Sequence, residues 1–193
     1  MSDWLHRQLD DHLAVARAVD ALTDQLRSVG SLLCETFERG GVVYTFGNGG
    51  SAADAQHLTA ELIGRYRRDR RPLPAVTLST DPSVSTCIAN DYSAADVFRR
   101  QVQALARPGD VVVAFTTSGR SPNVVGALEV ARVKGATTVL FGGGDGGPAL
   151  AYADHPLLVR SDVTARIQEM HTLLLHLISE MVDAWAAGEE PSA

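Results

Sequence analysis

Two glycine- and hydroxyl-rich turns each lie where a run of β-branched residues gives way to a helical pattern. The first, at 47–51, reads Gly-Asn-Gly-Gly-Ser, and the second, at 116–121, reads Thr-Thr-Ser-Gly-Arg-Ser. A turn of this kind points backbone N–H groups and the positive end of the following helix at one place. Each turn ends in a residue, Ser51 or Ser121, that can cap that helix. Together the turns predict a pair of phosphate-binding loops.

Five short apolar segments rich in β-branched residues alternate with helical stretches or turns, as in a buried parallel sheet. They span residues 42–46, 74–79, 111–116, 137–141 and 156–160. With right-handed crossovers, this rhythm predicts an α/β fold, a flavodoxin-like three-layer sandwich with a central five-stranded parallel sheet. Ligands of such sheets bind at the carboxyl ends of the strands, and both glycine-rich turns fall at such ends.

Amphipathic helical patterns flank this alternation. Apolar residues three and four apart predict a long helix over about 3–27 and a second over 32–39, which the glycines at 40–41 end. The last helix, about 164–187, is apolar on more than one side. One small domain needs less apolar helix than this, so we expect the long N- and C-terminal helices to bury their excess surface in an oligomer. The tail, 188–193, is expected to fray.

The composition is that of a single domain with a small ligand. The chain has 193 residues, 45% of them hydrophobic, and no composition shift marks a linker. We therefore expect one domain over 1–193, with N-terminal helices in 1–40 and the α/β core and C-terminal helix in 41–187. A net charge of −6 argues against nucleic acid or a membrane as the main partner. Cys34 and Cys87 lack redox or metal spacing, and no signal peptide is evident, so a cytoplasmic protein is expected.

One helix carries a histidine and a carboxylate in register. His57 and Glu61 are four residues apart, which puts them on one face and about 6 Å apart along the helix axis. Side chains placed in this way can bind one zinc ion or transfer protons. On an arbitrary helix they would more often be a plain surface pair. Because this helix begins at the first glycine-rich turn, we expect the pair to face the ligand pocket.

The last helix supplies Gln168, His171 and His176. Gln168 and His176 are eight residues apart, which corresponds to about 12 Å of rise along the helix. One metal would reach both only by stretching both side chains. If both ligate zinc, we expect them to come from different subunits. Taken alone, either histidine is more often an ordinary helix residue than a ligand.

Three further patterns have simpler explanations beside the functional ones. The arginine-rich stretch 65–71 is expected to be mostly a solvated loop. Asn90-Asp91 is either a turn or a pair of hydrogen-bonding groups for sugar hydroxyls. Residues 47–52 also fit the loose dinucleotide pattern G-x-G-x-x-[G/A], which requires an acid about 20 residues on. The first acid after the second strand, Asp81, lies too far along, so a redox enzyme is disfavoured.

Five separate motifs together resemble the bacterial phosphoheptose isomerases of the sugar isomerase (SIS) family. They are Gly-Asn-Gly-Gly-Ser at 47–51, Asp-Ala-Gln-His at 54–57, Ala-Asn-Asp-Tyr at 89–92, Thr-Ser-Gly-x-Ser at 117–121 and Ala-Arg-Ile-Gln-Glu-Met-His at 165–171. The resemblance implies an aldose–ketose isomerase that converts sedoheptulose 7-phosphate to D-glycero-D-manno-heptose 7-phosphate through a metal-stabilised enediolate, for heptose-nucleotide biosynthesis. It further implies a homotetramer with one Zn²⁺ per subunit, bound between subunits.

Matched position by position, the resemblance also implies residue roles. The zinc ligands would be His57, Glu61, Gln168 and His176, with Glu61 and His176 as the acid–base pair. Substrate contacts would fall on Asn48, Gly49, Gly50, Ser51, Glu61, Asn90, Asp91, Thr116, Thr117, Ser118, Ser121 and Gln168.

Some positions depart from the family pattern. Thr116 replaces the usual Ser, Arg120 replaces a common Asn and would add positive charge beside the phosphate loop, and Ala165 stands where some members carry an Asp that reaches the sugar. The alternative function is a non-catalytic SIS protein that binds a phosphosugar or recruits a partner. Some relatives of that kind lack the metal-site Glu and the second His. The presence of Glu61 and His176 therefore favours the enzyme.

Overall fold

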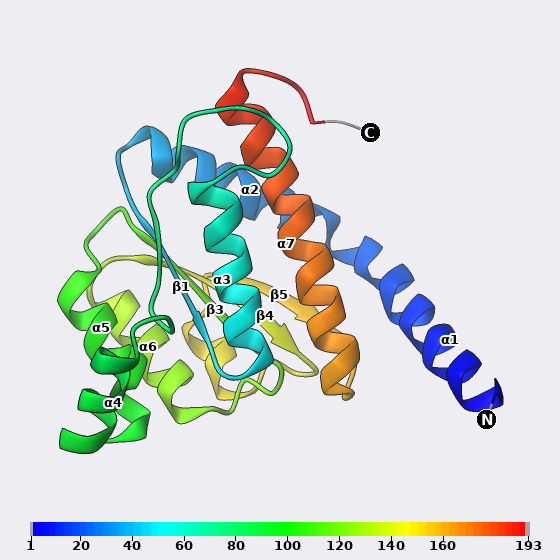
Figure 1. Cartoon of the computed structure of the whole chain (residues 1–193), viewed down its shortest axis with the longest axis horizontal. Helices are drawn as coiled ribbons and strands as arrows, with labels where there is room; N and C mark the ends of the chain where they lie inside the picture. The colour runs from blue at the N-terminus through cyan, green and yellow to red at the C-terminus, as the bar shows by residue number, and fades with distance from the viewer. Residues whose placement is uncertain (1, 192–193) are drawn as a thin grey trace.

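The computed structural model describes residues 2–191 and consists of a five-stranded parallel sheet between two layers of helices (Figure 1). The strands are β1 (Val43–Gly47), β2 (Ala75–Thr77), β3 (Val111–Thr116), β4 (Thr137–Gly143) and β5 (His155–Val159). All five predicted strands are present, and the predicted fold class is confirmed. The strand order is β2-β1-β3-β4-β5, the flavodoxin-like order, so the chain changes direction across the sheet between β1 and β3. The turns that follow these two strands therefore lie side by side.

Both faces of the sheet are covered by helices, and the core is therefore double. On one face lie α2 (Thr23–Glu38), α3 (Gly50–Ile63) and α7 (Thr164–Ala187); on the other lie α5 (Val97–Leu105) and α6 (Pro122–Val133), with α4 (Pro82–Asp91) packed on α5. Strand β3 shows how the layers divide. Val113 and Phe115 belong to the first core, and Val112 and Ala114 to the second. Because both faces are covered, β1, β3 and β4 are buried along nearly their whole length, whereas the edge strand β2 alternates between buried and exposed residues.

The N-terminal helices break at a different place from the one predicted. The structure has α1 (Ser2–Ala18), a 3₁₀ turn η1 (Val19–Leu22) and an unbroken α2, so the predicted gap between 27 and 32 is wrong. A glycine, Gly30, lies in the middle of α2 and costs helix propensity, about 1 kcal/mol relative to Ala. It also lets α2 approach α7 closely, since a Cβ there would lie 2.6 Å from the Met181 side chain. Tertiary packing thus offsets the weak local propensity.

The basic stretch 65–71 and the C-terminal tail contact each other. Gly188 ends α7 with a positive φ of 73°, and the Glu189 N–H donates to the Ala184 carbonyl at 2.9 Å. Arg68 Nε then donates to the Glu189 carboxylate at 2.9 Å, and its Nη2 donates to the Glu190 carbonyl at 3.0 Å. Of the tail expected to fray, residues 192–193 lie outside the described part of the chain. Among the described residues, no helix is long and apolar enough to cross a membrane.

Candidate active site

The first glycine-rich turn connects β1 to α3. Gly49 holds the N-cap position with a φ of 56°, and α3 begins at Gly50. Ser51 was predicted to cap this helix, but it lies inside the first turn and is buried, so that prediction is wrong. The helix begins two residues early because glycine accepts the left-handed conformation that starts it. In the first turn of α3, the Ser51 and Ala52 N–H groups donate to the Asn48 and Gly49 carbonyls at 3.1 and 3.0 Å, so the backbone of the turn closes on itself around Gly49 and Gly50.

The second turn connects β3 to α6 and matches its prediction more closely. Ser121 occupies the N-cap position and Pro122 the first helical position. The Ser121 side chain makes no capping hydrogen bond, which leaves its hydroxyl for a ligand. Two hydrogen bonds within the turn stabilise its shape. The Gly119 N–H donates to Thr116 Oγ1 at 3.1 Å, and the Arg120 N–H donates to Ser118 Oγ at 3.2 Å.

A pocket of about 290 Å³ lies between the two turns. It is lined by Asn48, Gly49, Gly50, Ser51, Phe115, Thr116, Thr117, Ser118, Ser121, Thr164 and Gln168. Gln168 reaches it from α7 and lies against Gly50, where an added Cβ would be 2.5 Å from the Gln168 amide nitrogen. A neighbouring pocket of about 420 Å³ shares Thr117, Ser118 and Thr164 with it. The fold thus brings most of the predicted substrate contacts to one place.

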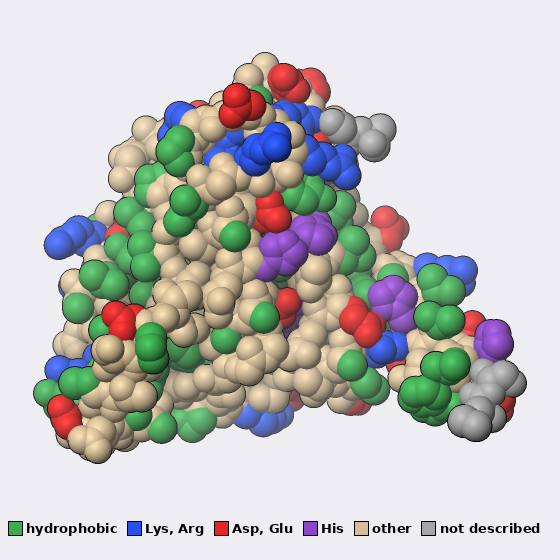
Figure 2. Space-filling model, in the orientation of Figure 1, with side chains coloured by type: hydrophobic (Ala, Val, Ile, Leu, Met, Phe, Trp, Pro, Cys, Tyr) green, Lys and Arg blue, Asp and Glu red, His purple; other side chains and the backbone are tan. Residues whose placement is uncertain are grey.

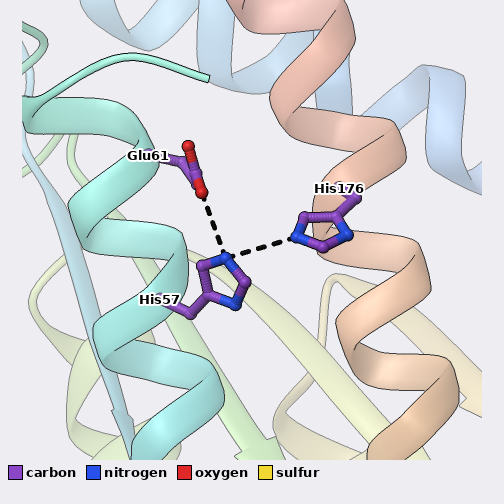
Figure 3. A group of neighbouring side chains, drawn as sticks. All are labelled: His57, Glu61 and His176. Carbon is purple, nitrogen blue, oxygen red and sulfur yellow. Dashed lines mark hydrogen bonds and ion pairs between the residues drawn. The ribbon is translucent and has the colours of Figure 1, made fainter. Parts of the chain in front are cut away.

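His57, Glu61 and His176 form a compact group between α3 and α7 (Figure 3). His57 Nε2 lies 3.0 Å from Glu61 Oε1 and 3.2 Å from His176 Nε2. The possible ligand atoms of the three residues all lie within 4.8 Å of one another. Two ligands of a tetrahedral zinc ion are about 3.3 Å apart, and two imidazoles with one carboxylate are a common zinc set. The donor types and their spacing therefore fit such an ion.

Gln168, the fourth predicted ligand, lies at the pocket of the turns, two helical turns before His176. Within one chain, Gln168 therefore lies at the pocket between the turns and His176 lies in the possible metal group, as their separation along the helix predicts. A metal ligand role for Gln168 stays a prediction that requires a second subunit. Figure 2 shows histidine side chains at the surface between α3 and α7, open to a partner or a ligand.

Asn90 and Asp91 end α4 and are exposed. In the part of the chain that the structure describes, they do not line the pocket between the turns. The Asn90 amide donates to Asp91 Oδ1 at 2.8 Å, and the Cys87 thiol lies 3.5 Å from Asp91 Oδ2. Their predicted contact with substrate therefore also stays a prediction.

The structure reveals contacts around the site that the sequence interpretation missed. Asn123 and Asn48 exchange two amide hydrogen bonds, of 3.0 and 2.9 Å, which tie the second turn to the first. Asn123 follows the second turn by two residues, and this position in the sequence could have indicated that it lies near the first turn. The charge of Arg120, expected beside the phosphate loop, is paired with Asp145 at 3.1 Å.

The site combines a histidine of low pKa with a buried carboxyl. Burial lowers the pKa of His176, and the adjacent His57 lowers it further, which favours the neutral form of the His176 ring. Asp54 lies one turn before His57, and burial raises its pKa, although Thr172 Oγ1 donates to its Oδ1 at 3.1 Å. Its other oxygen is buried without a hydrogen-bond partner among the described residues.

His171 makes the stability of the fold depend on pH. Its ring is fully buried against Phe115 and Phe141 and donates from Nε2 to the Gly142 carbonyl at 3.2 Å. Burial lowers its pKa from 6.5 to about 4. Because the unfolded chain then binds a proton more readily, stability is lost as the pH falls from 6.5 towards 4, by up to about 1.4 kcal/mol per pH unit.

Urea unfolding of chelator-treated protein between pH 8 and pH 5 measures this dependence. His171→Leu is expected to be less stable than wild type at pH 8 and to lose less stability on acidification. Parallel pH profiles for the two proteins would contradict the assignment to His171.

Comparison with known proteins places the chain among sugar isomerases. Residues 9–143 match the SIS domain family. A phosphoheptose isomerase of Trichlorobacter lovleyi is 46% identical over 184 residues, which cover 95% of this chain and 94% of that protein. The structure of the phosphoheptose isomerase from Neisseria gonorrhoeae is 36% identical with a TM-score of 0.89, covering 94% of this chain and 98% of that one. The enzyme from Francisella tularensis is 31% identical with a TM-score of 0.91, covering 94% and 97%.

Proposed function

The chain belongs to the SIS domain family, and we propose that it interconverts sedoheptulose 7-phosphate and D-glycero-D-manno-heptose 7-phosphate. As an isomerase of this family it supplies heptose biosynthesis, for the cell envelope or for a secondary metabolite. One observation carries the proposal. A possible metal group, His57, Glu61 and His176, and a pocket made of two phosphate-type turns lie along the same pair of helices, α3 and α7.

The reaction moves a carbonyl between C1 and C2, so a proton must leave one carbon and reach the other. We assign Glu61 and His176 as the acid–base pair, because a neutral His176 can accept a proton and Glu61 is 3.0 Å from the shared His57 ring. His57, Glu61, Gln168 and His176 would hold a Zn²⁺ ion. When bound, that ion would act as a Lewis acid and stabilise the negative charge of the enediolate.

The two turns would bind the phosphate, which stays unchanged during the reaction. Hydroxyl groups of Ser51, Thr117, Ser118 and Ser121 surround the pocket, and the N-terminal ends of α3 and α6 add positive potential. Asn48 is held by Asn123 at the mouth of the same pocket. The phosphate would therefore anchor one end of the sugar and leave the other end for the acid–base pair.

The runner-up function is a SIS protein that binds a phosphosugar without converting it. Incubation with sedoheptulose 7-phosphate, followed by NMR, separates the two functions. The appearance of an aldoheptose phosphate is expected. Binding of the ketose without formation of the aldose would support the runner-up.

We further propose a cytoplasmic homotetramer with sites shared between subunits. Helix α1 projects from the body of the protein, and its apolar residues Trp4, Leu5, Leu9 and Leu13 are 50–62% exposed (Figure 1). An apolar stripe of this size is typical of a protein interface. Gln168, Asn90 and Asp91 would then complete the site of a neighbouring subunit. Both cysteines are free thiols, as in a reducing compartment.

Mixing inactive variants tests the shared site. Gln168→Ala and His176→Ala should each be nearly inactive, and co-expression should restore part of the activity. If the two residues of one site come from different chains, random assembly gives about a quarter of the sites both native side chains. Pull-down through a tag on one subunit verifies mixed assembly. Verified mixed tetramers with no recovered activity would contradict the shared site.

A further inference from the structure

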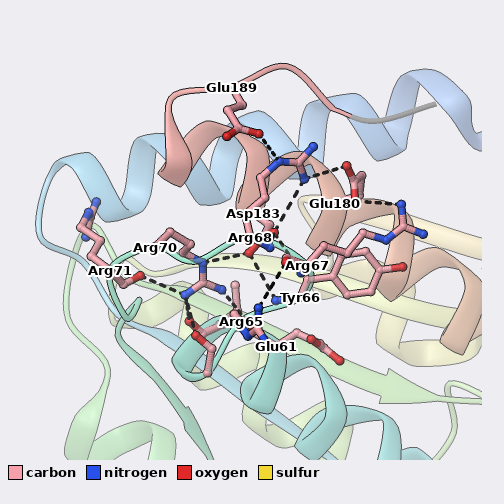
Figure 4. A network of polar contacts seen from close by, with 12 residues as sticks. Glu61, Arg65, Tyr66, Arg67, Arg68, Arg70, Arg71, Glu180, Asp183 and Glu189 are labelled. Atoms are coloured by element: carbon pink, nitrogen blue, oxygen red, sulfur yellow. Dashed lines mark hydrogen bonds and ion pairs between the residues drawn. The ribbon is translucent and has the colours of Figure 1, made fainter.

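One arginine of the basic stretch caps the helix that carries His57 and Glu61. The Arg70 side chain is only 1% exposed. Its Nη2 donates to the Glu61 carbonyl at 2.5 Å, and its Nη1 donates to the carbonyls of Leu62, Gly64 and Arg71 at 2.8, 3.1 and 2.9 Å. The last carbonyls of a helix have no partner within it and carry partial negative charge. Arg70 satisfies them at the end of α3 (Figure 4).

The same arginine reaches across to α7. Arg70 Nε donates to Asp183 Oδ1 at 3.0 Å, and the Asp183 side chain is fully buried. Asp183 also accepts the backbone N–H groups of Tyr66, Arg67 and Arg68 at 3.3, 3.1 and 2.8 Å. Burial by itself would raise the pKa of Asp183, but these hydrogen bonds outweigh it and lower the pKa. The prediction of a mostly solvated loop is therefore wrong for this part of the stretch.

These contacts converge on the possible metal group from two sides. Arg70 binds the backbone of Glu61 itself, and Asp183 lies two helical turns after His176 on α7. In addition, the Tyr66 ring packs against the His176 ring, with 5.5 Å between the two ring centroids. A change in the Arg70–Asp183 contact would therefore shift α3 relative to α7, and with it the spacing of Glu61 and His176.

A buried ion pair is a weak source of net stability, because the loss of hydration of both charges offsets their attraction. Its geometric effect is large, because both partners are committed to fixed backbone groups. We propose that Arg70 is a positioning residue of the isomerase site, which, paired with Asp183, holds Glu61 and His176 at the separation that their shared function requires. This inference rests on the proposed function.

Arg70→Lys tests it, since Lys keeps the charge but lacks the planar fork that reaches carbonyls and carboxylate together. Zn²⁺ affinity, measured by competition with a chromophoric chelator on protein that circular dichroism shows to be folded, is expected to fall ten- to a hundredfold. The kcat should fall as well. The KM for the sugar phosphate should stay within about twofold, because the phosphate turns belong to other parts of the chain. Asp183→Asn should act in the same direction.

Asp110→Asn is the matched control. Asp110 is also a buried carboxylate that accepts two backbone N–H groups, but these belong to Val42 and Arg107, in the segments before β1 and β3, and not to α3, α7 or the basic stretch. Its loss should lower stability and leave Zn²⁺ affinity unchanged. If Arg70→Lys does not fold, Asp183→Asn, which keeps the size of the side chain and removes the charge that pairs with Arg70, should still weaken Zn²⁺ binding.

Folded Arg70→Lys with the Zn²⁺ affinity and kcat of wild type would overturn the proposal. If wild-type protein binds no Zn²⁺ or converts no heptose phosphate, the proposed function fails separately. The imidazole ¹H–¹⁵N NMR shifts of His57 and His176 in metal-free protein then decide. They should change in Arg70→Lys and stay unchanged in Asp110→Asn, and unchanged shifts in Arg70→Lys would refute the positioning role.

Discussion

Glu61→Gln is expected to lower kcat by about a thousandfold or more and to leave the fold intact. The change keeps the size of the side chain but removes both a charged metal ligand and a proton-transfer group, and general acid–base catalysis alone contributes about 10²–10⁴. The carboxylate lies 3.0 Å from His57 and is 18% exposed, so the variant can keep its packing. Steady-state kinetics measure the fall in kcat, and elemental analysis of bound zinc measures the loss of the metal ligand.

Chelation of the wild-type enzyme should have the same effect, and added Zn²⁺ should restore turnover. Glu129→Gln, an exposed carboxylate on α6 away from the group, is the control and should keep wild-type kcat. Full activity of chelated protein would contradict the zinc role. Full activity of Glu61→Gln would remove Glu61 from the acid–base pair.

Gly119→Ala is expected to cost roughly 2–4 kcal/mol of stability and to raise the KM for the sugar phosphate strongly. Gly119 has a φ of 63°, and a Cβ there would lie 1.9 Å from the Gly146 carbonyl oxygen. The second turn must therefore move, and it carries Ser118 and Ser121. Urea unfolding measures the stability, and initial-rate kinetics measure the KM.

Gly40→Ala separates backbone strain from this collision. Gly40 also has a positive φ, of 76°, but a Cβ there meets nothing within 4 Å. It should cost about 1 kcal/mol and leave the KM unchanged. Equal stability and equal KM for the two variants would show that the close approach of Gly119 to Gly146 does not matter for substrate binding.

Local patterns along the chain were sufficient to predict the sheet and the chemistry at its edge. Buried parallel strands are continuous apolar runs, so all five appear in the sequence, and glycine-rich turns mark where they end. The i, i+4 spacing of His57 and Glu61 also determined that they share one helix face. Such features depend on neighbours within a few residues, which the sequence displays directly.

Tertiary packing decided what those patterns left open. It kept α2 continuous through Gly30 because the close contact with α7 offsets the poor helix propensity of glycine. It also brought His176 to His57 from 119 residues away, while it left Gln168 at the glycine turns. Helix periodicity predicts which residues of one helix share a face. Which residues of α3 and α7 contact each other depends on how the two helices pack, and the sequence pattern does not show this.

The basic stretch 65–71 shows most clearly what the sequence predicts and what only tertiary packing decides. From the sequence, residues 65–71 are a run of arginines whose simplest state is solvated. In the folded chain, the Arg70 side chain is buried because Asp183, more than a hundred residues later, and the last carbonyls of α3 supply its partners. The sequence by itself determined that positive charge follows α3. Only the tertiary structure decided that this charge is buried, because the cost of burying an ion depends on groups that folding alone brings within hydrogen-bond distance.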